Sequence, residues 1–248
     1  MKRFLWMLLA FSLFALPAAA DPLTMLEDYS DTVSFPYDEA DPSAGTFQYS
    51  FRYPRVSPDE EGGAAISAFY ADLADYQESF TIPVEQEALR GQDARITVDY
   101  TVTCNNDEFF SVLIRKEKQI AGQSGSFWEA HVFSRKNPNP GSSYTLPKLL
   151  NILSAVENED WIEQYQNKKA NAIVWQLVWD MIRDNEEGID YYPDYTEEYL
   201  AEDFNPEQEY YLDENGDPVF YINPGYAAPE SAGLLLFPIP LEDILDEL

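Results

Sequence analysis

Residues 209–240 read EYYLDENGDPVFYINPGYAAPESAGLLLFPIP, and this stretch decides the fold of the C-terminal half. Two aromatic-rich segments, residues 210–212 and 219–222, flank a turn of sequence Asp-Glu-Asn-Gly-Asp-Pro. Asn-Gly between two apolar runs is the strongest short-range signal for a β-hairpin. Prolines and glycines between positions 224 and 233 then interrupt regular structure before an apolar run at 234–237. The stretch therefore predicts a hairpin followed by a third strand.

Three segments upstream predict a second sheet, and they span residues 94–104, 108–120 and 127–136. The first alternates apolar residues with threonine and aspartate from Ile96 to Cys104, which is the period-two pattern of a half-buried strand. Short turns rich in asparagine or glycine join the three segments, so we expect an antiparallel meander. Residues 47–53 also alternate aromatic with polar side chains and predict a further strand.

Helical spacing of apolar residues predicts three helices. The first begins at Gly62-Gly63 and ends before Pro83, and it carries an aromatic stripe that is typical of core packing, with a sugar-binding groove as the alternative. The second covers residues 158–185 and should pack on a sheet. The third, at 196–204, begins at a threonine cap.

These elements predict an α+β fold in which antiparallel sheets are each covered by a helix and two subdomains pack as one unit. The expected divisions are a signal peptide at 1–20, an acidic lead-in at 21–45, an N-terminal α+β subdomain at 46–145 and a C-terminal domain at 146–248. The lead-in shows no sustained periodicity, so we expect only partial order there.

The first 20 residues have the three parts of a secretory signal peptide. Lys2 and Arg3 precede an apolar run that ends near Leu16, and three alanines finishing at Ala20 form the cleavage site. The apolar run is shorter than the roughly 20 residues that a membrane-spanning helix needs. We therefore expect cleavage after Ala20, an extracytoplasmic or secreted protein, and no membrane span after cleavage. A retained anchor is the alternative.

The chain carries 45 acidic and 15 basic residues, which gives a formal net charge of −30. Such a charge opposes binding to nucleic acid and speeds encounter with cationic partners. On charge alone, solubility without any partner is the preferred explanation.

Two residue types that often carry chemistry occur once each. Cys104 lies on the apolar face of its predicted strand, so we expect a buried small hydrophobe rather than a nucleophile. His131 lies two residues from Glu129 in a predicted strand, where it could act as a general base. Because no nucleophile motif accompanies it, a hydrogen-bonded structural histidine is the preferred interpretation.

The sequence contains no motif for a cofactor, a metal or a catalytic group, so we predict none of the three. The acidic turn at 213–217 places oxygen ligands around Gly216, but the chain has Pro224 where a calcium loop needs a bidentate glutamate. We interpret these residues as turn formers. A glycan hydrolase that uses two carboxylates stays open, because 45 acidic residues neither exclude nor locate such a pair.

The C-terminal motifs carry a family resemblance. They comprise Tyr210-Tyr211-Leu212-Asp213, Gly216, Val219-Phe220-Tyr221, Pro224-Gly225-Tyr226, Ala232-Gly233 and Phe237-Pro238-Ile239-Pro240. With these motifs the chain resembles the extracytoplasmic C-terminal domain family of the lysozyme-sensing anti-sigma factor RsiV, a bacterial domain family of unknown function. The upstream half is similar to the domain that precedes it there and in some peptidoglycan deacetylases.

The resemblance implies a secreted, non-catalytic binding or sensory protein of the cell envelope. Its implied partner is a cationic protein such as a lysozyme, or cell-wall glycan, and its oligomeric state is left open. For the binding surface we select Tyr221, Tyr226 and Glu230 in the C-terminal stretch.

Overall fold

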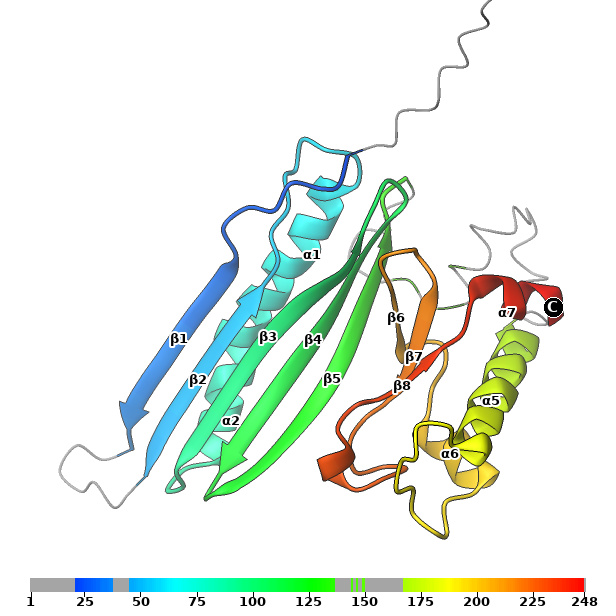
Figure 1. Cartoon of the computed structure of the whole chain (residues 1–248). Helices are drawn as coiled ribbons and strands as arrows, with labels where there is room; N and C mark the ends of the chain where they lie inside the picture. Colours follow the sequence, from blue (N-terminus) through cyan, green and yellow to red (C-terminus); the bar gives the residue numbers. More distant parts are fainter. Residues whose placement is uncertain are drawn as a thin grey trace, which may run out of the picture.

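The computed structural model describes residues 21–37, 45–136, 144, 146, 149 and 167–247. The predicted signal peptide, the boundary near residue 145 and the first part of the helix predicted at 158–185 lie outside these residues. The rest forms a mixed α+β fold with a five-stranded sheet and a three-stranded sheet (Figure 1), which confirms the predicted fold class.

The five-stranded sheet contains the predicted meander. Its strands, in spatial order, are β1 (Tyr29–Pro36), β2 (Thr46–Tyr53), β3 (Ala94–Asn105), β4 (Phe109–Ile120) and β5 (Gln123–Ser134). The β3–β4 and β4–β5 pairs are antiparallel, as expected from their short turns. The β2–β3 pair is parallel, so the prediction of purely antiparallel sheets was wrong at this one place. The reason is the helical connection between β2 and β3, because parallel neighbours require a crossover.

That crossover is one continuous helical segment with a change of winding. It comprises α1 (Gly63–Tyr76), a π-helical turn η2 (Gln77–Thr81) and α2 (Ile82–Ala88). We expected the helix to end before Pro83, but it continues through it. Pro83 falls in the first turn of α2 after the π-helical turn, where a missing N–H costs no regular helical hydrogen bond.

Strand β1 forms inside the segment expected to be a partly ordered lead-in. It pairs antiparallel with β2 and is an edge strand, with most of its side chains exposed. Only Tyr29, Val33 and Phe35 pack against the core, so its alternation is carried by three apolar residues. The acidic composition around it conceals this short pattern.

Helices α1 and α2 cover one face of the five-stranded sheet (Figure 1). The core between these helices and the sheet is aromatic, with Phe47, Tyr49, Tyr70 and Phe110 fully buried.

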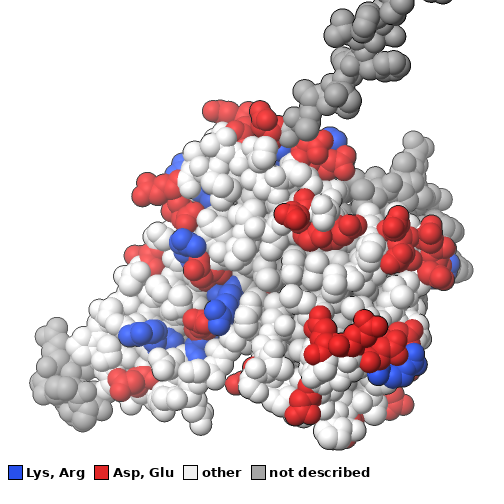
Figure 2. Space-filling model, in the orientation of Figure 1, with Lys and Arg blue, Asp and Glu red and all other residues white. Residues whose placement is uncertain are grey.

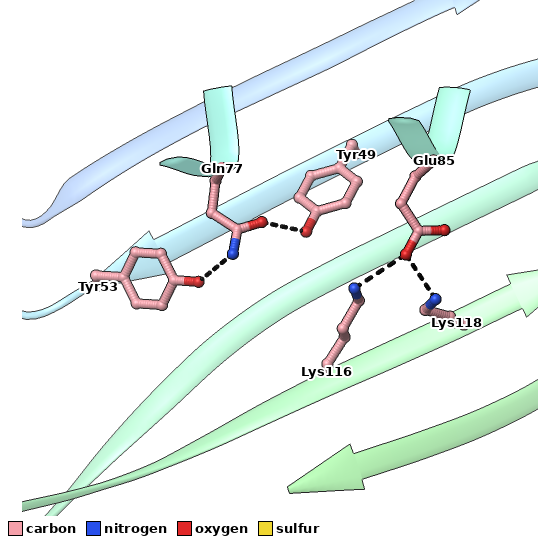
Figure 3. Close-up of polar contacts among 6 residues, drawn as sticks. All are labelled: Tyr49, Tyr53, Gln77, Glu85, Lys116 and Lys118. Atoms are coloured by element: carbon pink, nitrogen blue, oxygen red, sulfur yellow. Dashed lines mark hydrogen bonds and ion pairs between the residues drawn. The ribbon is translucent and has the colours of Figure 1, made fainter. Parts of the chain in front are cut away.

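Polar bridges also join the helices to the sheet (Figure 3). The Gln77 side chain accepts a hydrogen bond from the Tyr49 hydroxyl at 2.7 Å and donates to the Tyr53 hydroxyl at 2.9 Å. Glu85 of α2 accepts from Lys116 and Lys118 of β4 at 3.1 and 2.6 Å. Burial alone would raise the pKa of Glu85, but the two lysine hydrogen bonds outweigh it and hold the pKa below its usual value.

The C-terminal module contains the predicted hairpin and third strand. Its sheet consists of β6 (Tyr210–Leu212), β7 (Pro218–Ile222) and β8 (Leu235–Pro238), all antiparallel. Around it lie α5 (Asn167–Asp184), α6 (Glu197–Asp203), the 3₁₀ turn η4 (Glu230–Ala232) and α7 (Leu241–Glu247). Thr196 caps α6 as expected, by accepting from the backbone N–H of Tyr199. The short helix α7 was not expected, because only Ile244 in it is fully buried.

The free edge of β5 is covered by hydrogen bonds to the backbone of three of its residues, Trp128, Ala130 and Val132. The Asn223 side chain accepts from the Trp128 N–H at 2.7 Å and donates to the Trp128 carbonyl at 3.2 Å. Two residues on, the Ala130 backbone N–H hydrogen-bonds to the Tyr221 hydroxyl. The Val132 carbonyl accepts from the Tyr144 N–H at 2.6 Å. These bonds satisfy an edge that would otherwise be open to another strand.

Cys104 is buried, as predicted, and burial raises the pKa of its thiol to about 11. Its position in the sheet differs from the prediction. A register shift between Val102 and Cys104 turns its side chain out of the core beneath α1 and into the core of the C-terminal module, where it packs with Phe109 and Val132.

Candidate binding site

The three residues selected from sequence lie in different environments. Tyr221 is only 2% exposed, because it belongs to β7, the central strand of its sheet, and its hydroxyl braces β5. A partner cannot contact it directly in this fold. Tyr226 is 48% exposed in the loop before η4. Glu230 begins η4 and faces the open side of the five-stranded sheet, where it lines a hollow.

His131 is a hydrogen-bonded structural histidine. Its Nε2 lies 3.0 Å from Glu129 and its Nδ1 lies 3.3 Å from the Tyr70 hydroxyl. Because a carboxylate only accepts, Nε2 donates to Glu129, and the tautomer with its proton on Nε2 accepts from the Tyr70 hydroxyl at Nδ1. The ring also packs edge-on against Phe69 and Phe133. Both nitrogens are therefore used within the fold.

The acidic turn of the hairpin uses its carboxylates on its own backbone. Asp213 accepts from the N–H groups of Asn215 and Asp217, at 2.8 and 3.0 Å. Asp217 accepts from the Leu241 N–H at 3.1 Å, which joins the turn to the start of α7. Gly216 supplies the positive φ of 91° that the turn needs. The interpretation of these residues as turn formers is confirmed.

A hollow with both apolar and acidic lining lies in the C-terminal module, between the end of α5 and the chain from β8 into α7. It has a volume of about 410 Å³. Its apolar wall comprises Leu177, Met181, Ile189, Leu236, Phe237 and Ile239. Five carboxylates surround it, from Asp180, Asp184, Glu186, Glu187 and Asp243. We call this site the acidic pocket.

The acidic side chains around the acidic pocket stand where the dipole of helix α5 disfavours negative charge. The last turn of α5 contains one basic residue, Arg183, whose guanidinium pairs with Asp180 at 2.5 Å. Asp184 and the glutamates that follow stand at the negative end of the helix dipole, where basic side chains stabilise and acidic ones do not. The arrangement therefore gives up some helix stability and concentrates negative potential at the pocket.

Acidic side chains are also more numerous, relative to basic ones, in the C-terminal module than in the five-stranded sheet and its helices. Residues 167–247 contain 20 acidic and three basic side chains, whereas residues 45–136 contain 14 acidic and nine basic. Figure 2 shows the same division, with acidic side chains dominating over the C-terminal module and the basic ones mostly over the sheet. The acidic pocket thus lies in the more negative half of the described chain.

Sequence reasoning did not select the acidic pocket. Leu177 and Met181 were expected on the apolar side of a helix, and the acidic run after Asp184 is visible in the sequence. What closes the pocket is the packing of residues 236–240 against α5, which no local pattern predicts.

The two carboxylates with the clearest opposed shifts lie near Tyr221. Burial raises the pKa of Glu209, while the hydrogen bond from His131 lowers the pKa of Glu129. Both interact electrostatically with the Tyr221 hydroxyl. Neither residue lines the acidic pocket or the hollows on the sheet.

The fold and surface define a two-module α+β protein with an acidic C-terminal module. Residues 155–242 match the model of a family described as a protein of unknown function, DUF3298. A DUF3298 family protein from Bacteroides fragilis NCTC 9343 is similar in structure, with a TM-score of 0.52 and 12% identity over 89% of this chain and 92% of that one. Another from Pseudomonas aeruginosa PAO1 has a TM-score of 0.51 and 10% identity over 91% and 94%.

At these identities the likeness concerns the fold alone. No curated protein matches the chain. In the part of the chain that the structure describes, no helix has the length and apolar character to cross a membrane.

Proposed function

We propose that this is a secreted, non-catalytic binding protein of the cell envelope, which holds a cationic protein at the acidic pocket of its C-terminal module. The observation that carries the proposal is the pocket itself, an apolar hollow surrounded by five carboxylates. Secretion rests on the signal peptide predicted at residues 1–20.

The chemistry of the pocket favours a protein partner over a small cation. Met181 and Leu236 are 38% and 40% exposed at the pocket, so apolar area is available to be covered. A metal ion gains nothing from such a wall. A lysine or arginine side chain does, because its apolar stem packs on the wall while its charged head reaches the carboxylates. The surrounding acidic surface would speed encounter with a basic protein.

The RsiV-like resemblance of the C-terminal motifs suggests lysozyme as the first partner to test. The test uses the mature chain, residues 21–248, and measures its binding to hen egg-white lysozyme by calorimetry at several salt concentrations. We expect affinity to fall as salt rises, because exposed charges are screened beyond about 10 Å at 0.1 M salt.

A matched pair of variants locates the site. The double variant Asp184→Asn/Glu187→Gln removes two charges at the pocket, and Asp72→Asn/Asp75→Asn removes two exposed charges on α1. We expect the first to weaken lysozyme binding at least tenfold and the second to change it less than threefold. Equal losses of lysozyme affinity in the two variants would mean that only the net charge of the chain matters, which would contradict a binding site at the pocket.

A carboxylate-pair glycan hydrolase is the second candidate. It is favoured only by the opposed pKa shifts of Glu129 and Glu209, which both interact electrostatically with Tyr221. Release of reducing ends from peptidoglycan, abolished by both Glu129→Gln and Glu209→Gln, would establish it in place of the binding role. Absence of turnover by the purified mature chain would remove it.

A further inference from the structure

The face of the five-stranded sheet that α1 leaves uncovered carries a second surface, in which basic side chains stand among carboxylates. In Figure 2 most of the visible lysine and arginine side chains gather over this face. Two adjoining hollows lie there, of about 230 and 530 Å³, and they share Thr97, Arg115 and Glu117. Trp128 lines the first, while Arg95 and Ser126 line the second. We call the pair the arginine hollow.

The two arginines of the hollow differ in their partners. Arg115 projects from β4 with its side chain 51% exposed, and its guanidinium lies 5.2 Å from the centre of the Trp128 ring. It also pairs with Glu117. Arg95 donates from Nε to the amide oxygen of Gln48 at 2.9 Å, and within the described residues no carboxylate forms an ion pair with it. Its remaining guanidinium donors are therefore available to a ligand.

The same hollow holds groups that recognise sugar hydroxyls. Thr97, Ser126 and Glu117 offer hydroxyl and carboxylate oxygens around a half-buried tryptophan ring. The part of the indole that the Arg115 guanidinium leaves exposed gives a sugar ring an apolar contact, and the neighbouring groups give it hydrogen-bond partners. Glu230 of η4 also lines the hollow.

From this combination we propose that the arginine hollow binds a saccharide that carries a carboxylate group. An arginine fork pairs with a carboxylate through two parallel hydrogen bonds, and the tryptophan and hydroxyl groups take the sugar ring. The acidic side chains of Glu117 and Glu230 accept bonds from sugar hydroxyls, and they repel a densely charged phosphate polymer more strongly than a saccharide with a single carboxylate. The site is distinct from the acidic pocket, so either can exist without the other.

The test compares two tetrasaccharides of equal length by calorimetry with the mature chain. One is a repeat of N-acetylglucosamine and N-acetylmuramic acid, which carries lactyl carboxylates, and the other is chitotetraose, which carries none. We expect the first to bind at least tenfold more tightly. Equal affinities, or no binding of the first at millimolar concentration, would overturn the proposal. So would tighter binding of a glycerol phosphate oligomer than of the carboxylated tetrasaccharide.

Variants assign the binding to the hollow. Arg115→Gln should reduce affinity for the carboxylated tetrasaccharide at least tenfold, and Arg90→Gln, which removes an exposed arginine at the end of α2, should change it less than twofold. Equal effects of the two variants would overturn the assignment. Lysozyme binding by Arg115→Gln should match the unmodified chain, which separates this proposal from the role of the acidic pocket. Loss of lysozyme binding in that variant would contradict two separate sites.

Discussion

Replacing Asn223 by alanine tests the contact between the C-terminal module and strand β5 of the five-stranded sheet. Asn223 is almost fully buried and uses both ends of its amide on the backbone of Trp128. The substitution removes two hydrogen bonds and leaves an N–H and a carbonyl of an edge strand without their partner. It also removes a hydrogen bond that lowers the pKa of Glu209, so that carboxyl is shifted further upward.

The expected cost follows from the two bonds. Each contributes about 1 kcal/mol net, and an unsatisfied buried group costs a further 1–3 kcal/mol where water does not replace the bond. Because Trp128 is only half-buried, water reaches part of the gap. We expect Asn223→Ala to lower the free energy of unfolding by about 2–3 kcal/mol.

Equilibrium unfolding in urea measures this loss, with Asn215→Ala as the matched control. Asn215 lies exposed in the hairpin turn and its side chain makes one long bond, 3.3 Å to Asp213, so its replacement should cost less than about 0.5 kcal/mol. Hydrogen exchange at the Trp128 amide gives a local readout, and we expect it to speed up in Asn223→Ala. A loss no larger than that of the control, with unchanged protection at Trp128, would refute the role of Asn223 as the cover of β5.

Three further outcomes follow from single side chains. The pKa of Glu85 is lower in the folded chain than in the unfolded chain. The stability that ionised Glu85 contributes is therefore fully present above the unfolded pKa of about 4.3 and is lost as pH falls through the folded pKa. In urea titrations, Glu85→Gln should lose less stability between pH 7 and pH 3 than the unmodified chain. Cys104 should react with a thiol reagent at pH 7.5 only when urea unfolds the chain, since burial raises its pKa to about 11. Tyr221→Phe should destabilise by about 1 kcal/mol and leave lysozyme affinity unchanged, because its hydroxyl bonds to β5 and not to a partner.

Local patterns predicted the elements whose partners are close in sequence. The Asn215-Gly216 turn gave the hairpin, and alternation from Ile96 onward gave the meander, since both signals are complete within a dozen residues. The parallel pairing of β2 with β3 was not readable, because it depends on where a helix of some 25 residues returns the chain.

The candidate site was predicted less well than the fold. Tyr221 was selected as an aromatic residue in a family-like motif, yet an isolated motif does not show that its strand is buried on both faces. Arg95 and Thr97 do lie on the polar face expected from alternation, but their meeting with Trp128 and Glu230 depends on tertiary packing. The sequence shows which chemical groups the chain carries, but it does not show which of them come together in the fold.

The distribution of charge favours a binding role over solubility alone as the explanation of the acidic composition. Acidic residues that serve only solubility have no reason to prefer one module, and they avoid the C-terminal end of a helix because the dipole there disfavours them. In this chain Asp184, Glu186 and Glu187 follow the end of α5 and surround an exposed apolar wall. The open face of the sheet meanwhile carries Arg95 and Arg115 beside Glu117 and Glu230, so acidic side chains do not dominate there as they do around the acidic pocket. Solubility alone predicts that charge removal has the same effect on partner binding wherever it is made, and the paired variants at α5 and α1 would show that equality if it held.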